Sequence, residues 1–467
     1  MKKIKIGVIV IFSLLLILPI IFLNTQENYI SEIDNRKLEE LPKISEMRKN
    51  FDEYKVKLET YIDDRIGFRN EFIEYYTLLN DKLFNKMVHP TYTYGKDGNV
   101  FMKINRSSWD YEFLEEFAQL VKKMQTYCEE RNTPFVFAIE PSKARIYTEY
   151  LPKGVNLNTK GIDWLTNRLE ELNINFVDNT DLLREKSKTE QIYNLKYDAG
   201  HWNDLGAFYG TNNILKKVEE SFPNVKGNKW EDMILSEKVI EDLPNSNFKI
   251  NETVPVLNLK PSKEYSLESE KYVNEIKIDK KHAHFAYIKN LQEKTKESPK
   301  TLVFQGSYYN TRHKFFQGQL RDYIAVHNYE NVINLDYYFN VFKPECVIFE
   351  VADYTIHSAY FNYDNMKNKV FNPSLNSFKN IKTKVLNIKP KVNIKQGETL
   401  CDININEVDK DIKYAYLEVD GKVYDMSINE DNSLSVTIEN TNIKEDSKIN
   451  LSIISNDLKT KTIYKDI

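Results

Sequence analysis

The feature that most constrains the fold is an alternation of short apolar runs with longer amphipathic segments between residues 109 and 351. In the amphipathic segments apolar residues recur every three or four positions, which is the period of a helix. The apolar runs are bounded by turn-forming residues, as buried strands are. Since helical connections join parallel strands, the alternation predicts an α/β fold, a mainly parallel sheet flanked by helices. We expect strands at 135–139, 174–177, 301–304, 332–335 and 346–351, and helices at 109–130, 161–172 and 315–326.

A serine follows one of these predicted strands. The strand at 301–304 ends at Gln305-Gly306-Ser307-Tyr308, where the glycine permits a sharp turn. Functional residues of α/β sheets gather at the carboxyl ends of the strands, so we expect the Ser307 hydroxyl to be exposed at that edge. Ser307 is therefore the candidate nucleophile.

A second segment supplies the base that such a serine needs. Asp198 stands three positions before His201, on a loop that opens a helix. The imidazole can accept the serine proton on one ring nitrogen, while the carboxylate binds the other nitrogen and fixes the tautomer. A lone histidine is usually a surface or core residue, but the flanking Gly200 and Trp202 and the helix that follows favour a functional site. We therefore predict a triad of Ser307, His201 and Asp198.

Metal and disulfide sites are not indicated by the sequence. A metal site needs three or four convergent ligands at suitable spacing, and no cluster of Cys and His supplies them. The cysteines, Cys128, Cys346 and Cys401, are sparse and odd in number, which does not suit a disulfide framework. We predict no metal and no cofactor.

The charge balance restricts the class of partner. The net charge is −4 at pH 7, whereas a nucleic-acid-binding protein normally shows a basic face. We therefore expect no nucleic-acid partner. Aromatic residues make up 13% of the chain, which suits both large cores and surfaces that stack on sugars.

The N-terminus carries an apolar run at 6–23 behind lysines at positions 2, 3 and 5. As a helix this run spans about 27 Å at about 1.5 Å per residue, close to the roughly 30 Å of a bilayer core. The lysines before it and Glu27, Glu32 and Asp34 after it place the N-terminus inside. We expect residues 1–25 to be a single-pass anchor in the cell membrane, with the bulk of the chain extracytoplasmic. A cleaved signal peptide is the rival interpretation, but residues 24–27 offer no small-x-small cleavage site.

The remaining chain divides into three parts by its pattern. Residues 26–90 have a helical period and are expected to pack as a helical segment on the next part. Residues 91–384 contain the α/β alternation, a predicted hairpin at 94–101, and a polar stretch at 226–300 whose organisation cannot be read from the pattern. Residues 385–467 show short strands between turn signals, which predicts a small antiparallel β-sandwich.

The residues around the histidine resemble a known family. The spacing of Asp198 and His201 is similar to the last motif block of SGNH hydrolases. The segment His201-Trp202-Asn203-x-x-Gly206-Ala207 resembles the Asp-x-His-Trp…Gly-Ala segment of SGNH-like proteins of the AlgJ/AlgX type, which include the DHHW family. The resemblance covers about residues 32–355, and in that family the Asp-His pair also precedes the serine. Two differences stand out: Gln305-Gly306 replaces the usual Gly-Asp before the serine, and Asp198 lies one position farther from the His-Trp pair.

The resemblance implies an SGNH-like fold and O-acetylation of a cell-envelope or exported polysaccharide. Ser307 would take an acetyl group as nucleophile, with His201 as base and Asp198 as its orienter, and a sugar hydroxyl would then attack the acyl-enzyme. The backbone N–H of Ser307 and the side chain of Asn310 are candidate oxyanion donors by proximity in sequence. Since a cytoplasmic acetyl donor cannot reach an external domain unaided, the resemblance also implies a membrane-bound acyltransferase as donor partner.

Two other functions fit the same residues. With water as acceptor, the triad would make a carbohydrate acetylesterase, and the difference depends on how well the site excludes water. The changed Gln305-Gly306-Ser307 segment also fits a non-catalytic envelope scaffold that binds glycan or an assembly partner. For residues 385–467, carbohydrate binding and a purely structural role are both open.

Overall fold

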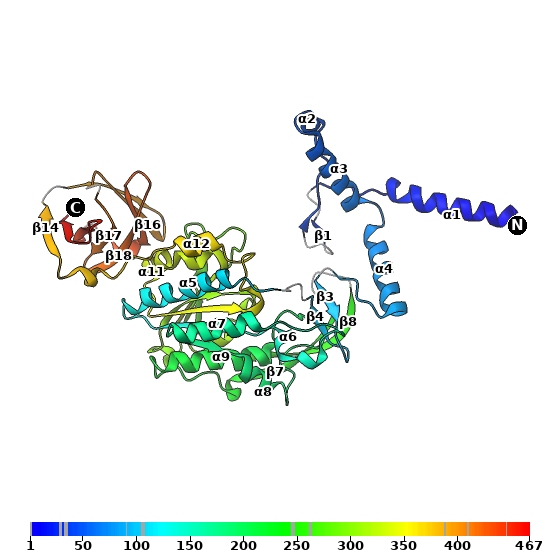
Figure 1. Ribbon diagram of the computed structural model, residues 1–467, viewed down its shortest axis with the longest axis horizontal. Coiled ribbons are helices and arrows are strands. Elements are labelled where there is room, and N and C mark those ends of the chain that lie inside the picture. The colour runs from blue at the N-terminus through cyan, green and yellow to red at the C-terminus, as the bar shows by residue number, and fades with distance from the viewer. Residues whose placement is uncertain are drawn as a thin grey trace.

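The computed structural model describes residues 2–27, 30–31, 36–89, 91–103, 108–243, 248–260, 264–386, 389–408, 411–444 and 446–467. Its centre is a seven-stranded sheet with the order β6-β5-β13-β11-β12-β10-β9 (Figure 1). The first five strands in this order are parallel, and β10 and β9 add antiparallel strands at one edge. The predicted mainly parallel sheet is confirmed. The bounds are β5 Phe135–Glu140, β6 Phe176–Asp178, β9 Tyr265–Leu267, β10 Phe285–Asn290, β11 Lys300–Gln305, β12 Asp322–His327 and β13 Cys346–Ala352.

Helices cover both faces of this sheet, which gives three layers. Successive strand residues point to opposite faces, so Phe137 and Phe304 enter one core and Val136 and Val303 the other. Helices α5, α7, α11 and α12 pack on the first face, and α8, α9 and α10 on the second. Burial on both faces explains why the central strands carry apolar residues on both sides. The bounds are α5 Tyr111–Glu129, α7 Lys160–Glu171, α8 Thr180–Lys186, α9 Asp204–Glu219, α10 Lys314–Gln317, α11 Leu335–Phe342 and α12 Tyr363–Asn368.

Two predicted elements are wrong. In place of the helix at 315–326, the short α10 is followed by β12, a central strand that is buried along its whole length. An apolar run of this kind cannot be distinguished from a buried helix by its period alone. In place of the strand at 332–335, a 3₁₀ turn leads into α11. Leu335, Tyr338 and Phe342 extend the apolar pattern at helical spacing, and all three enter the core.

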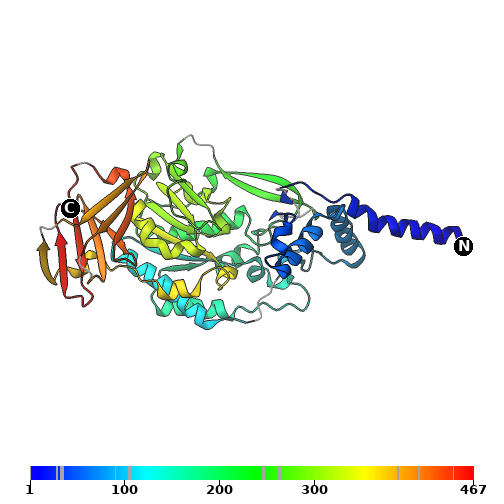
Figure 2. The ribbon, with the colours of Figure 1, turned by 90° about the horizontal axis from the view of Figure 1, so that it is seen from above.

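The polar stretch at 226–300 contains a long antiparallel arm outside the main sheet. The arm consists of β7 Met233–Asp242 and β8 Lys249–Leu259 and extends toward the N-terminal helices (Figure 2). Near its end it shares an apolar cluster with the hairpin of β3 Tyr92–Tyr94 and β4 Val100–Met102. Pairing of β3 with β4 confirms the predicted hairpin. Ala199 belongs to the same cluster, so the arm contacts the segment that precedes His201.

The N-terminal part is helical. Among the described residues, α1 Lys2–Ile21 is the one helix long and apolar enough to cross a membrane, with a mean hydropathy of 2.8 over Ile4–Ile21. It extends away from the rest of the molecule (Figure 1). Two of the acidic residues used to predict its orientation, Glu32 and Asp34, lie outside the described residues. Three helices follow it: α2 Ile44–Met47, α3 Phe51–Arg65 and α4 Arg69–Phe84.

These helices do not pack on the α/β part as closely as expected. Phe51 is 63% exposed and Leu83 is 68% exposed, although both belong to the apolar period that predicted the helices. The spacing of the apolar residues shows that each helix has an apolar face. It does not show which surface covers that face.

An eight-stranded sheet forms the C-terminal part, with the order β14-β21-β20-β17-β18-β19-β16-β15. It folds around one core that includes Ile403, Leu417 and Leu451. All neighbours are antiparallel except β14, which lies parallel to the last strand, β21. The division after residues 25, 90 and 384 stays a prediction, and β14 spans the last of these positions. The bounds are β14 Lys382–Leu386, β15 Lys391–Gln396, β16 Leu400–Asn406, β17 Tyr414–Val419, β18 Lys422–Ile428, β19 Leu434–Glu439, β20 Ile449–Ile454 and β21 Thr460–Tyr464.

The two sheets meet through Asp425 on β18. Its carboxylate accepts hydrogen bonds from the Tyr127 hydroxyl at 2.5 Å and from Arg131 Nη2 at 2.9 Å, at the end of α5. Asn340 on α11 binds the backbone of Asp425 through two further hydrogen bonds. Since the end of α5 leads into β5, this junction lies at the amino edge of the seven-stranded sheet. The carboxyl edge therefore faces the opposite way, toward the hairpin β3-β4 and the N-terminal helices (Figure 1).

Candidate active site

The turn after β11 carries Ser307. Gly306 follows the strand, and Ser307 opens a 3₁₀ turn, η5 Ser307–Tyr309. The N–H of Gly306 donates a hydrogen bond to Glu350 Oε2 on the neighbouring strand β13 at 2.6 Å. A Cβ at position 306 would lie 3.2 Å from Asn328 Nδ2 and 3.4 Å from the same Glu350 oxygen. The glycine therefore lets the turn approach β13 closely, and the serine is placed at the carboxyl edge, where the sequence predicted it.

The segment before α9 brings His201 to this serine. His201 Nε2 lies 2.8 Å from Ser307 Oγ, and His201 Nδ1 lies 2.5 Å from Asp198 Oδ1. An ionised carboxylate only accepts hydrogen bonds, so Nδ1 carries the hydrogen and Nε2 is left to accept the serine hydroxyl hydrogen. The structure thus brings the three residues that the sequence singled out into one chain of contacts.

The surroundings of Asp198 favour its ionised form. Burial raises the pKa of Asp198, but the hydrogen bond and charge of His201, together with the Arg312 guanidinium, outweigh burial and lower the pKa below its usual value. Arg312 Nη2 lies 3.3 Å from Asp198 Oδ2, and Arg312 Nε lies 3.4 Å from Asp204 Oδ1. Asp198 has a φ of 50°, in the left-handed region that aspartate adopts more readily than most residues. Arg312, which the sequence did not indicate, therefore fixes the second oxygen of this carboxylate.

The start of α9 explains how this loop is formed. Asn203 caps the helix, since its Oδ1 accepts hydrogen bonds from the N–H groups of Leu205 and Gly206 at 3.0 and 3.1 Å. Trp202 is fully buried, and its Nε1 donates to the Tyr308 carbonyl at 3.3 Å. Gly210 leaves room for the indole, because a Cβ there would lie 2.3 Å from the Trp202 ring. The neighbours of the histidine and of the serine thus bind one another and hold the two segments together.

Two ionisable side chains hold the segment just before Asp198. Glu252 on β8 accepts hydrogen bonds from three consecutive backbone N–H groups, at 2.6, 2.9 and 2.6 Å for Leu195, Lys196 and Tyr197. The buried Lys143 Nζ donates to the carbonyl oxygens of Asn194 at 2.8 Å and Leu195 at 2.7 Å. The same Nζ donates to the Val100 carbonyl at 2.9 Å, which ties the hairpin to this segment. The arm, the hairpin and the short helix α6 Lys143–Ile146, which follows β5, therefore all fix the position of the loop.

A tyrosine that the sequence analysis missed also contacts the serine. The side chain of Tyr354 lies beside that of Ser307, and burial raises the pKa of Tyr354 well above its usual value, so the phenol stays protonated. Tyr354 lies in the 3₁₀ turn Asp353–Thr355 that follows β13, at the same edge as Ser307. The rule that functional residues follow parallel strands would have identified it.

The predicted oxyanion donor Asn310 lies at the end of the turn that Ser307 opens. Its backbone N–H donates to the Ser307 carbonyl at 3.3 Å, and its side chain is exposed. Its assignment as an oxyanion donor stays a prediction.

Two buried carboxyl groups lie behind the serine turn. Burial raises the pKa of Glu350 to about 8. Burial, followed by the proximity of Glu350, raises the pKa of Glu140 well above its usual value. Glu140 Oε2 accepts a hydrogen bond from Asn179 Nδ2 at 2.8 Å, so the pair is part of a buried polar network. At neutral pH these groups favour the uncharged form, and Glu350 supports the turn without adding a full negative charge beside the nucleophile.

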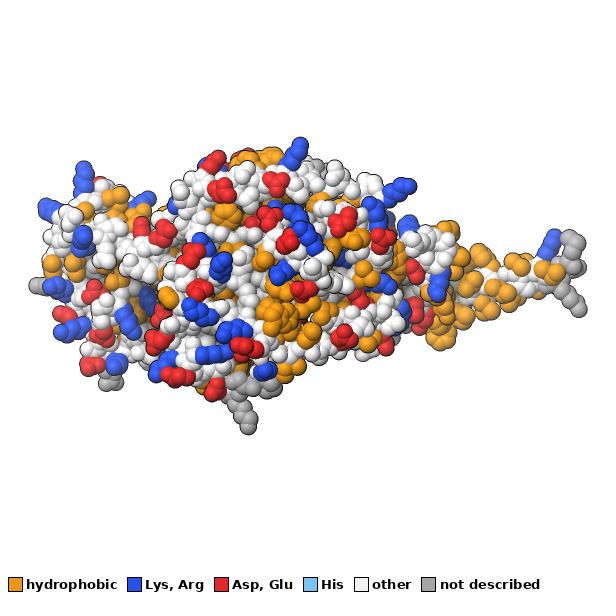
Figure 3. Space-filling model, turned by 90° about the horizontal axis from the view of Figure 1, so that it is seen from below, with side chains coloured by type: hydrophobic (Ala, Val, Ile, Leu, Met, Phe, Trp, Pro, Cys, Tyr) orange, Lys and Arg blue, Asp and Glu red, His pale blue; other side chains and the backbone are white. Residues whose placement is uncertain are grey.

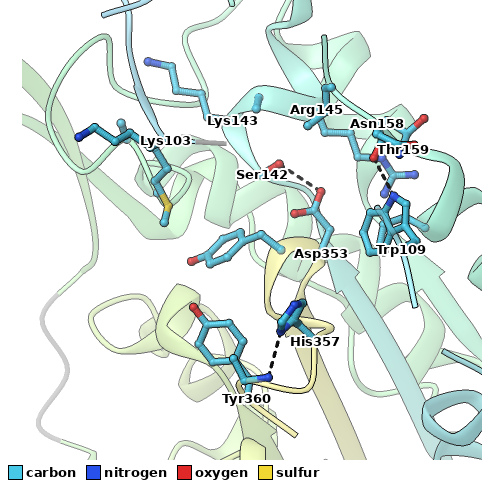
Figure 4. Close-up of a pocket in the computed structure, with 18 residues that line it drawn as sticks. Lys103, Trp109, Ser142, Lys143, Arg145, Asn158, Thr159, Asp353, His357 and Tyr360 are labelled. Atoms are coloured by element: carbon cyan, nitrogen blue, oxygen red, sulfur yellow. Dashed lines mark hydrogen bonds between the residues drawn. The ribbon is translucent and has the colours of Figure 1, made fainter. Parts of the chain in front are cut away.

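A cavity of about 370 Å³ adjoins the triad. Ala199 and Gly200, which precede His201, line it together with Tyr354. Figure 4 shows Lys103 and Trp109 on opposite sides of this cavity, with His357 and Tyr360 near its lower side. Aromatic faces beside polar side chains are suited to a sugar ring.

No metal site was found in the part of the chain that the structure describes. In that part, no group of three or more His, Cys, Asp and Glu side chains is arranged to hold an ion.

Comparison with known proteins places the chain in a family. A search of curated protein sequences gave no match. Similar solved structures are PatB1 of Bacillus cereus (15% identity, 57% of this chain and 97% of that chain covered, TM-score 0.46), the O-acetyltransferase domain of AlgJ from Pseudomonas putida (15%, 60% and 100%, 0.42) and a DHHW family protein from Eubacterium siraeum (17%, 62% and 98%, 0.41). Residues 93–331 match the family model described as "SGNH hydrolase-like domain, acetyltransferase AlgX". Since this match covers more than half of the sequence, the chain belongs to the AlgX family of SGNH hydrolase-like acetyltransferase domains.

Proposed function

We propose that this protein is a membrane-anchored, extracytoplasmic O-acetyltransferase that acetylates a cell-envelope or exported polysaccharide through Ser307, His201 and Asp198. One observation carries the proposal: the contact of Ser307 Oγ with His201 Nε2 at 2.8 Å, in a chain that belongs to an acetyltransferase family. A free serine hydroxyl is a poor nucleophile near neutral pH, and a base in hydrogen-bond contact removes that limitation.

The first half-reaction forms an acetyl-serine. His201 Nε2 takes the hydroxyl proton while Ser307 Oγ attacks the acetyl carbonyl of the donor, which forms a tetrahedral intermediate. The intermediate collapses with loss of the donor's leaving group, which takes the proton from His201. Asp198 keeps Nδ1 protonated and stabilises the imidazolium. The Tyr354 hydroxyl, the Ser307 N–H and the Asn310 amide are the candidate donors to the oxyanion.

The second half-reaction transfers the acetyl group to the glycan. A sugar hydroxyl gives its proton to His201 as its oxygen attacks the acetyl-serine carbonyl. The bond to Ser307 Oγ then breaks, and the serine recovers the proton from His201. The cavity beside Ala199 and Tyr354 is the proposed position of the acceptor sugar, because its aromatic lining can shield the ester from water.

The proposal also includes a membrane anchor, α1, and a partner that supplies the acetyl groups. The length and hydropathy of α1 and the lysines before it support a single membrane span with the remaining chain outside. An external site needs acetyl groups delivered across the membrane, which a membrane-bound acyltransferase partner would supply.

The test is turnover of an activated acetyl ester by the full chain, with and without a glycan acceptor. We expect Ser307→Ala and His201→Ala each to abolish turnover. His282→Ala is the matched control, because His282 Nδ1 lies 3.0 Å from Asp279 Oδ2 in the same three-residue spacing but outside the triad. O-acetylated glycan as product supports the transferase, whereas free acetate alone indicates an acetylesterase. Turnover that survives both triad substitutions would remove the proposed triad, whereas no turnover by the unaltered chain would leave the non-catalytic scaffold.

A further inference from the structure

Helix α4 exposes an apolar stripe along its length. The stripe side chains recur at steps of three and four, which places them on one face of the helix. They are large, and each is about half exposed or more: Phe72 at 46%, Tyr75 at 65%, Tyr76 at 57%, Leu79 at 54% and Leu83 at 68%. Single exposed apolar residues are normal on protein surfaces, but a continuous stripe on one helix marks a contact surface.

The opposite face of α4 is the one directed at the rest of the protein. Asp81 accepts a hydrogen bond from the Tyr94 hydroxyl of β3 at 2.6 Å. Ile73 and Thr77, near it on the helix face, are half-buried. Glu74 is also on this side by helical spacing. The stripe is therefore not the side by which α4 is attached to the α/β part.

The stripe is continuous with the end of α1. The rings of Phe22 and Phe68 are 5.2 Å apart, and those of Phe68 and Phe72 are 6.5 Å apart. The Gly67 N–H donates to the Pro19 carbonyl at 2.8 Å, and a Cβ on Gly67 would lie 2.6 Å from the Phe22 carbonyl oxygen. The row of rings thus joins the membrane-spanning candidate to α4. Figure 3 shows hydrophobic side chains continuing from α1 onto the surface at its base.

Charges around the stripe have the arrangement of a helix at a membrane surface. Arg69 and Lys82 lie at the two margins of the stripe by helical spacing, with Glu71 next to Lys82, and long cationic side chains at a margin can reach phosphate headgroups. Glu74 and Asp81 lie on the side away from the stripe. Phe and Tyr predominate in the first half of the stripe, and aromatic residues are favoured at the boundary between hydrocarbon and water.

We propose that α4 lies in the interfacial layer of the lipid bilayer, with the Phe72–Leu83 stripe among the lipids and Asp81 facing the protein. The inference rests on the anchoring of α1 in the proposed function and adds a second attachment to the membrane. One spanning helix leaves the external part free to tilt about a single point. A second attachment fixes that tilt, with the carboxyl edge of the seven-stranded sheet turned toward the bilayer.

The experiment uses the full chain in vesicles of phosphatidylcholine and phosphatidylglycerol. Single cysteines are introduced by Leu79→Cys in the stripe, Glu74→Cys on the opposite side and Phe12→Cys in α1, and each is labelled with a fluorophore. The native cysteines are buried, so labelling goes to the introduced positions. Quenching is measured with nitroxide-bearing lipids and with aqueous iodide.

We expect the label at position 79 to be quenched several-fold more by lipid nitroxide than the label at 74, and less by iodide. Equal quenching at 79 and 74, with strong lipid quenching at 12, would overturn the α4 proposal while anchoring stands. Weak lipid quenching at 12 would remove the anchor and the proposal with it. Protection of position 79 from both quenchers would mean that protein covers the stripe, either a partner or a second copy, and would also overturn it.

Discussion

His201 Nε2 and Ser307 Oγ lie 2.8 Å apart although 106 positions separate them in the chain. The contact forms because the segment before α9 and the turn after β11 meet at one edge of the sheet, where Trp202 and Tyr308 also bind one another. The two segments are thus joined by a structural contact as well as by the proposed catalytic one.

Asp198→Asn should lower kcat on the order of 10³- to 10⁴-fold, because an amide can donate to Nδ1 and favours the wrong tautomer of His201. The fold should be kept, since Asn tolerates the left-handed backbone at this position. Steady-state kinetics with an activated acetyl ester measure the loss, and circular dichroism checks the fold. An activity close to that of the wild type would mean that Asp198 does not orient the base.

Glu252→Gln should reduce kcat by roughly 10- to 100-fold with little change in KM, because small displacements of catalytic groups are costly. The amide replaces one carboxylate oxygen with an N–H₂ group that cannot accept the hydrogen bonds now made to the backbone of 195–197. Glu237→Gln, an exposed position on the same arm, is the control and should change neither constant. Equal kinetics in both variants would show that the arm does not position the loop.

Glu350→Gln should flatten the pH dependence of stability. The pKa of Glu350 is raised to about 8 in the folded chain, whereas an unfolded glutamate has a pKa of about 4.3. The contribution of Glu350 to the free energy of unfolding is largest below about pH 4.3, where the group is protonated in both states. It decreases as the pH rises toward 8, because over this range the glutamate ionises in the unfolded chain but stays protonated in the folded one. Gln does not titrate but can still accept the Gly306 hydrogen bond, so the decrease in Tm between pH 5 and 8 should become smaller. Glu140 still titrates in the variant, so some slope should remain; identical slopes in both proteins would contradict the prediction.

Asp425→Ala should lower the free energy of unfolding by about 3 kcal/mol, because it leaves the largely buried Arg131 without its charged partner. The exposed Glu430, in the turn between β18 and β19, provides the control, and Glu430→Ala should stay within about 0.5 kcal/mol of the wild type. Denaturant unfolding followed by circular dichroism gives both values. A loss no larger than that of the control would mean that the junction contributes little to stability.

The elements that could be predicted from the sequence are those with a local sequence pattern. The strand at 301–304 and the glycine before Ser307 were identified because a buried run followed by a turn signal is a local pattern. The strand β12 was missed, since an apolar run without turn signals fits a helix equally well. The exposure of the apolar face of α4 was missed for a related reason: periodicity shows that a face avoids water without showing what covers it.

The supporting contacts of the site could not be predicted in the same way. Glu252 binds backbone N–H groups more than fifty positions away, and backbone groups leave no trace in the identity of the residues. Arg312 pairs with Asp198 over 114 positions, and many other arginines and lysines in the chain were equally plausible from the sequence. Tyr354, by contrast, follows a correctly predicted strand and was within reach of the sequence rule.

The junction at Asp425 has a consequence for how a long substrate would meet this protein. It fixes the eight-stranded sheet to the amino edge of the central sheet, so the two ends of the molecule have opposite surroundings (Figure 2). With α1 in the bilayer, the serine is near the base of the molecule and the C-terminal strands form its far tip. Under the proposed function, a polysaccharide emerging from the membrane would reach the serine first and the tip only afterwards, so acetylation would precede any binding of the product by the C-terminal strands.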